Sequence, residues 1–138
     1  MNKTKTFTIP TKAGTDVIDI TSEVSKIVSD SKIKSGIACV FVAGSTASIS
    51  TIEFEPNAVK DLKRALDKIA PENGDYEHHK TWGDDNGCAH VRACFMGPSR
   101  SFPFEDKKLI LGTWQQIVLL DFDTKNRERK IIVQIVGK

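Results

Sequence analysis

The grouping of strand-like segments along the chain is the feature that most restricts its fold. Segments that are apolar or rich in β-branched residues follow one another with little between them, and only two stretches repeat their apolar residues at helical spacing. A doubly wound α/β fold needs strands and helices in strict alternation. Because that alternation is missing, we predict an α+β fold with mostly antiparallel, β-sandwich-like sheets and two main helices.

The predicted strands are short segments with alternating or continuous apolar character. They cover residues 5–11, 16–20, 37–43, 46–52, 89–95, 107–112, 113–122 and 129–136. The segment 96–104, MGPSRSFPF, is rich in turn residues and is predicted to be a connecting loop in which Arg100 can meet an anion. Long strands at the chain ends leave edges that invite association, so we expect self-assembly.

The two predicted helices are marked by their end signals. The first begins at Thr21, a residue suited to capping a helix, and ends near Ser31. The second covers residues 56–70. It opens with Pro56, which suits the first helical turn, and stops because Pro71 cannot continue it.

Length, composition and charge exclude several classes of protein. With 138 residues and no repeat or linker, the chain is predicted to form one domain over residues 1–138. Its 20 basic and 18 acidic residues leave a net charge of +2, which gives no general argument for a nucleic-acid or membrane partner. No apolar run approaches the ~20 residues of a membrane span, and the N-terminus lacks the apolar core of a signal peptide. We therefore expect a cytoplasmic protein.

The segment HHKTWGDDNGCAH, residues 78–90, contains every histidine of the chain. Imidazole and carboxylate groups suit zinc or another divalent metal, so His78, His90 and Asp84 form one candidate metal site. Their spacing matches no established metal motif. An acid/base site and an ordinary polar loop therefore stay open as alternatives, and His79 is expected to be a solvated neighbour.

The predicted strand 89–95 would place three reactive side chains on one face. In a strand, His90, Arg92 and Cys94 point to the same side, while the residues between them face the core. An imidazole beside a guanidinium suits proton transfer next to a bound phosphate or carboxylate.

Polar residues elsewhere in the chain add three smaller candidates. Ser45 and Thr46 lie between two predicted strands, where their hydroxyl groups can hold an anion. Glu53 and Glu55 precede the second helix, where they can favour its positive N-terminal dipole or one of them, with Glu53 the candidate, can act as a general base. Trp114 is expected in the core or in a subunit interface rather than on a ligand-stacking surface, with Gln115 pointing away from it.

Several separated motifs together resemble the YjbQ-like family, whose members are often described as secondary thiamine-phosphate synthases. The motifs are STAS followed by Glu53, then YEH, GDDN with a histidine after it, LGTWQ, and a final D-x-x-x-x-x-R-x-R before the last strand. The resemblance covers nearly the whole chain. One departure concerns Gly44, which stands where many relatives carry a histidine, so no role of that histidine can be transferred.

The resemblance implies a homotrimeric α+β protein with its sites between subunits. The activity it implies is secondary formation of thiamine phosphate from an aminopyrimidine diphosphate and a thiazole phosphate. The family's polar cluster corresponds in this chain to Ser45, Thr46, Glu53, His78, Asp84, Asp85, Asn86, His90, Gln115, Arg127 and Arg129.

The leading hypothesis is therefore an enzyme that acts on a small phosphorylated molecule. The candidate catalytic residues are His78, His90, Asp84, Asp85 and Glu53. The candidate ligand-binding residues are Ser45, Thr46, Asn86, Gln115, Arg92, Arg127 and Arg129. A divalent metal, magnesium or zinc, is a possible cofactor: the aspartates can hold magnesium against a pyrophosphate, or the two histidines can bind zinc. The alternatives are a metal-dependent hydrolase that uses His78, Asp84 and His90, and a non-catalytic trimeric binding protein.

Overall fold

The protein is built from eight strands and four helices, described here by a computed structural model of residues 1–138. The strands are β1 (Asn2–Thr11), β2 (Asp16–Asp19), β3 (Gly36–Val42), β4 (Ala47–Ile52), β5 (Ser99–Glu105), β6 (Lys108–Leu109), β7 (Gln116–Asp121) and β8 (Arg127–Gly137). The helices are α1 (Thr21–Asp30), α2 (Pro56–Ile69), α3 (His78–Trp82) and α4 (Gly87–Met96).

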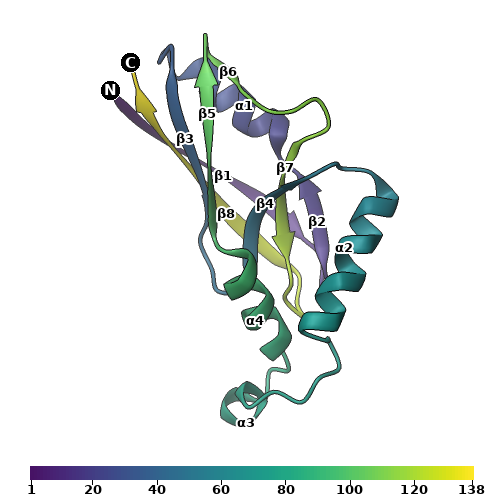
Figure 1. Cartoon of the computed structure of the whole chain (residues 1–138). Helices are drawn as coiled ribbons and strands as arrows, with labels where there is room; N and C mark the ends of the chain where they lie inside the picture. The colour runs from purple at the N-terminus through teal and green to yellow at the C-terminus, as the bar shows by residue number, and fades with distance from the viewer.

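The strands form two sheets in which every neighbouring pair is antiparallel. One sheet has the order β1-β8-β3-β5-β6 and the other has the order β2-β7-β4. In Figure 1 the helices α2 and α4 lie beside the lower part of the sheets, and the short α3 projects at the lower end. The predicted α+β class with antiparallel sheets is confirmed, although the chain has four helices and not two.

The main hydrophobic core lies between the two sheets. It contains 16 buried residues, among them the inward-facing side chains of β3 and β8 and the residues Ile49, Ile117 and Leu119 of the smaller sheet. A second cluster of six buried residues lies on the other side of β7 and includes Val118 and Leu120. Because β7 is buried on both faces, its apolar residues form a continuous run where a half-exposed strand would alternate.

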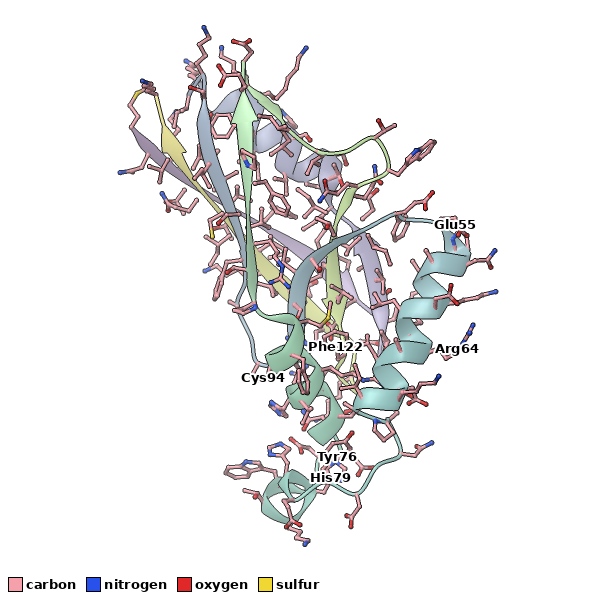
Figure 2. All side chains as sticks on the ribbon, in the orientation of Figure 1. Glu55, Arg64, Tyr76, His79, Cys94 and Phe122 are labelled. Atoms are coloured by element: carbon pink, nitrogen blue, oxygen red, sulfur yellow. The ribbon has the colours of Figure 1, made fainter.

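The predicted strand 89–95 is wrong, because these residues belong to helix α4. The buried residues Cys88, Ala89, Arg92 and Ala93 recur at helical spacing, and alanine is the best helix former. The small side chains of α4 let it pack closely on the second cluster, where Phe122 lies between α4 and α2 (Figure 2). The common face proposed for His90, Arg92 and Cys94 therefore does not exist.

The segment 96–104, predicted as a loop, instead contributes strand β5. Phe102 and Phe104 alternate with exposed residues and enter the main core. Pro103 occupies an exposed position of this strand, and its carbonyl accepts a hydrogen bond from the Ile110 N–H, which follows β6. Its backbone therefore faces the two-residue edge strand β6 and not the long strand β3, as expected for a proline in a sheet. The predicted strand 107–112 is reduced to the two residues of β6.

Trp114 is not a core residue of the chain, because 72% of its surface is exposed. It lies in the turn that leads into β7, and the following Gln115 donates to the Thr51 hydroxyl at 3.3 Å.

None of the four helices has the length and apolar character that crossing a bilayer requires.

Helix α2 begins under a side-chain cap from Glu55, labelled at its upper end in Figure 2. The Glu55 carboxylate accepts hydrogen bonds from the backbone N–H groups of Asn57 and Ala58. We expect Glu55→Ala to lower the free energy of unfolding by about 1 kcal/mol, because two donors of the first turn lose their acceptor. Urea denaturation measures this change. Glu53→Ala is the matched control, since the Glu53 carboxylate is exposed and caps nothing. Equal losses in both variants would contradict the capping role.

Candidate functional site

One polar cavity of about 440 Å³ gathers most of the residues that the sequence analysis selected. It lies where the start of β4, the connection from β7 to β8, helix α3 and the first turns of α4 meet. Its lining residues are Gly44, Ser45, Thr46, His78, Trp82, Asp84, Asn86, His90, Asp123, Arg127 and Arg129.

The floor of the cavity is held by a buried ion pair between β7 and β8. The guanidinium of Arg129 donates from Nε and Nη2 to the two carboxylate oxygens of Asp121, at 2.7 and 2.8 Å. Asp121 is completely buried and also accepts from the Thr11 hydroxyl and the Asp123 N–H. A bidentate pair with these further donors fixes the plane of the guanidinium group.

Asp123 forms a second node of the same network. Its carboxylate accepts from the Thr46 hydroxyl at 3.0 Å, from Arg127 Nε at 3.0 Å and from the Thr124 N–H at 2.7 Å. Burial by itself raises the pKa of Asp123, but the hydrogen bonds from Thr124, Thr46 and Arg127 outweigh it, so that the pKa lies below its ordinary value. Asp123 is therefore a structural anion that orients Arg127 and Thr46 toward the cavity.

Arg129 keeps one edge free of protein partners. Its Nε and Nη2 are engaged by Asp121, and Nη2 also donates to Thr46, whereas Nη1 makes no hydrogen bond to the protein. A Cβ atom on Gly44 would lie 2.9 Å from Nη1. Because Gly44 has no side chain, the free edge of this otherwise buried guanidinium reaches the cavity.

Two histidines and an aspartate line the same cavity as this guanidinium edge. The rings of His78 and His90 meet edge to face, with centroids 4.5 Å apart. His78 Nε2 lies 3.5 Å from Asp84 Oδ1. These two atoms and Asn86 Oδ1 are buried and have no hydrogen-bond partner within the chain, whereas most buried polar atoms of native proteins have one.

His79 is not the solvated neighbour that the sequence suggested. Its Nε2 accepts from the Gly87 N–H at 3.1 Å, so that the neutral ring carries its proton on Nδ1, which lies 3.3 Å from Asp85 Oδ1. Tyr76 packs against the same ring with centroids 5.4 Å apart (Figure 2). These contacts join the short helix α3 to the start of α4 and so place His78 over the cavity.

The geometry does not complete a metal centre from this chain alone. His78 and Asp84 are close, but no group of three or more His, Cys, Asp or Glu side chains is arranged to hold a metal ion. Asn86 Oδ1 is a further oxygen donor at the same place. A cation here would have to complete its coordination with oxygens of the bound molecule, as magnesium does in phosphate sites.

Four of the selected residues lie outside the cavity. Glu53 is exposed between β4 and α2, and Gln115 holds the turn before β7. Asp85 points outward, with 86% of its side chain exposed, and faces His79.

Arg92, the fourth, supports the fold from a different position. It is buried, donates to the Ala70 carbonyl at 2.9 Å and to the Thr15 hydroxyl at 2.7 Å, and lies 3.5 Å from Asp67. It therefore ties the end of α2 to α4 and to the turn between β1 and β2.

The sequence analysis assigned no role to Asp121, Asp123 or Trp82. The two aspartates flank Phe122 at the end of the apolar strand β7, and Arg127 and Arg129 follow a few residues later. Carboxylates at the end of an apolar run, close in sequence to two arginines, could have indicated buried ion pairs. Trp82, with 75% of its surface exposed, is the single hydrophobic residue that lines the cavity.

Comparison with known proteins places the chain among relatives of the same length and fold. The family model for UPF0047 protein YjbQ-like matches residues 5–138. The UPF0047 protein of Methanocaldococcus jannaschii is 33% identical over 132 residues, which cover 95% of this chain and 92% of the relative. The UPF0047 protein YugU of Bacillus subtilis is 33% identical over 134 residues, which cover 96% of this chain and 98% of the relative.

Two solved structures share the architecture. A YbjQ-like protein from Sulfolobus solfataricus is 36% identical, with a TM-score of 0.88 and full coverage of both chains. A protein from Aeropyrum pernix is 29% identical, with a TM-score of 0.91 and 99% of both chains covered. The chain belongs to the YjbQ/UPF0047 family, which confirms the resemblance read from its motifs.

The lowered pKa of Asp123 predicts a pH dependence of stability. Its ionised form is stabilised in the folded state, so this contribution is complete above about pH 5 and is lost as the pH falls below about 4. We expect the difference in unfolding free energy between the wild type and Asp123→Asn to be constant near neutral pH and to shrink in acid. Denaturant unfolding from pH 3 to 7 measures it. A difference that does not change with pH would show that Asp123 is not a stabilised anion.

Proposed function

We propose that the cavity binds a small phosphorylated molecule and catalyses a reaction at its phosphate-bearing end. The observation that carries this proposal is the free Nη1 edge of Arg129, a guanidinium that Asp121 fixes in place and Gly44 leaves uncovered. Guanidinium groups bind phosphate oxygens well because their donors are planar and always charged.

Further donors stand around the same point. Arg127 is held by Asp123 through Nε and Nη2, and it has no protein partner on Nη1. The exposed Ser45 lines the cavity, and its hydroxyl can donate to the same anion. Two guanidinium edges and a hydroxyl on one side of a polar cavity suit a phosphate or pyrophosphate group.

Three further residues of the cavity suit another part of the ligand. His78, Asp84 and Asn86 line the same cavity, and His78 Nε2, Asp84 Oδ1 and Asn86 Oδ1 have no hydrogen-bond partner. The Asp84 carboxylate and the Asn86 amide oxygen can accept hydrogen bonds from amino or hydroxyl groups of the ligand, and the His78 ring can donate or accept one. Asp84 and Asn86 would also be the residues to hold a magnesium ion, which would supply positive charge beside the phosphate.

The candidate reaction is the coupling of an aminopyrimidine diphosphate to a thiazole phosphate, which yields thiamine phosphate. The thiazole nitrogen forms a bond to the methylene carbon of the pyrimidine, and the bond from that carbon to the pyrophosphate oxygen breaks. The leaving pyrophosphate takes the electron pair, so its charge must be neutralised, which Arg127 and Arg129 can do. His90, in contact with His78, can donate a proton to this leaving group.

We also propose that the protein assembles as a homotrimer, as the family resemblance implies. Strand β1 leaves a ten-residue edge without a partner. The outer face of the same sheet exposes Ile37, Phe41 and Val136, which no helix of the chain covers. Free edges and apolar faces of this kind favour association with further copies.

The two alternative functions differ in what the cavity supports. A metal-dependent hydrolase would need a metal held by His78, Asp84 and His90, and these three groups do not form such a centre. A non-catalytic binding protein would keep the phosphate site but perform no turnover, so binding and catalysis have to be measured separately.

The first test addresses phosphate binding. We expect pyrophosphate to bind the wild type in isothermal titration calorimetry and Gly44→Ala to bind it about tenfold more weakly, because the new Cβ crowds Arg129 Nη1. Gly14→Ala is the control: Gly14 also has a positive φ, of 88°, but its Cβ would have no neighbour within 4 Å. The absence of binding in the wild type would remove the proposed function. Equal weakening in both variants would remove the role of the Arg129 edge.

The second test addresses catalysis. We expect the wild type with magnesium to release pyrophosphate and form thiamine phosphate from the two precursors, and His90→Ala to lose about 10²-fold or more in turnover while it still binds pyrophosphate. Product formation is followed by chromatography. Tight binding with no turnover in the wild type would favour the non-catalytic binding protein.

A further inference from the structure

A second cavity opens directly beside the main one. It has a volume of about 260 Å³ and shares Gly44, Ser45 and His90 with the polar cavity. The same three residues therefore border both cavities, and His90 is the one among them that carries an ionisable side chain.

The second cavity differs in chemistry from the first. Its remaining walls are Ala47, Ala93, Cys94 and Pro98, and no carboxylate or guanidinium group lines it. A cysteine thiol behaves in packing as a small hydrophobic group. The charged part of a ligand consequently has no reason to enter this space, whereas an uncharged part gains by leaving water.

Helix α4 links the two spaces. His90 and Cys94 are four residues apart on this helix and therefore lie on the same side of it, one turn from each other. A molecule whose reacting group touches the His90 imidazole extends along the helix and arrives beside the Cys94 thiol.

We propose that the phosphorylated ligand is bipartite, with a short apolar portion seated in the second cavity beside Cys94. This inference rests on the proposed function for its charged end, which the polar cavity takes. It adds the substrate class: phosphate esters that carry a small apolar group are bound in preference to inorganic phosphate.

The experiment uses the three cysteines of the wild-type protein as reporters. The protein is alkylated with N-ethylmaleimide, and the rate at each cysteine is read by mass spectrometry. The free protein is compared with protein holding inorganic phosphate or butyl phosphate, each at ten times its Kd from calorimetry. Cys94 is exposed and reports on the second cavity. Cys39, on the outer face of β3, is a control outside both cavities.

We expect butyl phosphate to slow alkylation of Cys94 by roughly tenfold, the factor set by site occupancy, while inorganic phosphate leaves it unchanged. Cys39 should react at one rate in all three samples. Cys88 should stay slow throughout, because it is buried and burial raises the pKa of its thiol.

Three outcomes would overturn the inference. If both compounds bind but protect Cys94 equally, or not at all, the apolar part does not enter the second cavity, and the phosphate site itself stands. If neither compound binds, the proposed function fails together with the inference. If Cys94 in the free protein reacts as slowly as Cys88, another copy of the chain covers the cavity and no ligand occupies it.

Discussion

The buried pair of Asp121 and Arg129 is the interaction on which the site depends. A buried charge is costly unless it is paired and its remaining hydrogen-bonding capacity is used, and here Thr11, Thr46 and the Asp123 backbone complete the network. The pair joins the end of β7 to the start of β8 and reaches β1 and the turn before β4. Because a bidentate pair allows little rotation, it also decides which edge of the guanidinium faces the cavity. The same contacts therefore stabilise the fold and prepare the site.

The polar cavity combines hydrogen-bond donors with groups that can accept. Arg127, Arg129 and Ser45 offer donors, and Asp84 and Asn86 carry oxygen atoms that can accept, beside the His78 ring. A ligand that satisfies both must carry an anionic end and a donor or a cation at its other side. His90 lines both the polar cavity and the second, more apolar cavity. This arrangement explains why a phosphate group alone would use only part of the available space.

Local sequence patterns predicted many of the elements well. The strands 37–43 and 129–136 have strong apolar patterns, and the helix 56–70 has apolar residues at helical spacing between two prolines. The prediction of a strand over 89–95 was wrong because it also rested on a local pattern, and in so short a segment strand alternation and helical spacing are hard to tell apart. The packing of Ala89 and Ala93 against residues distant in the sequence favours the helix. Arg92 was misplaced in consequence. Eight selected residues do line one cavity, but the partners of the arginines could not be assigned from the chain, since the pairing of Asp121 with Arg129 arises only when β7 and β8 come together.

The connection between α2 and α4 has a consequence for how such a site can diversify. It carries His78 and Trp82 on the five-residue helix α3 and Asp84 in the loop that follows, between the left-handed residues Gly83 and Asp85. The His79 bond to Gly87 holds it to helix α4. None of its residues belongs to either hydrophobic cluster. Replacement of this segment would change four of the eleven residues that line the cavity, His78, Trp82, Asp84 and Asn86, while the two hydrophobic clusters and the two arginines stay in place.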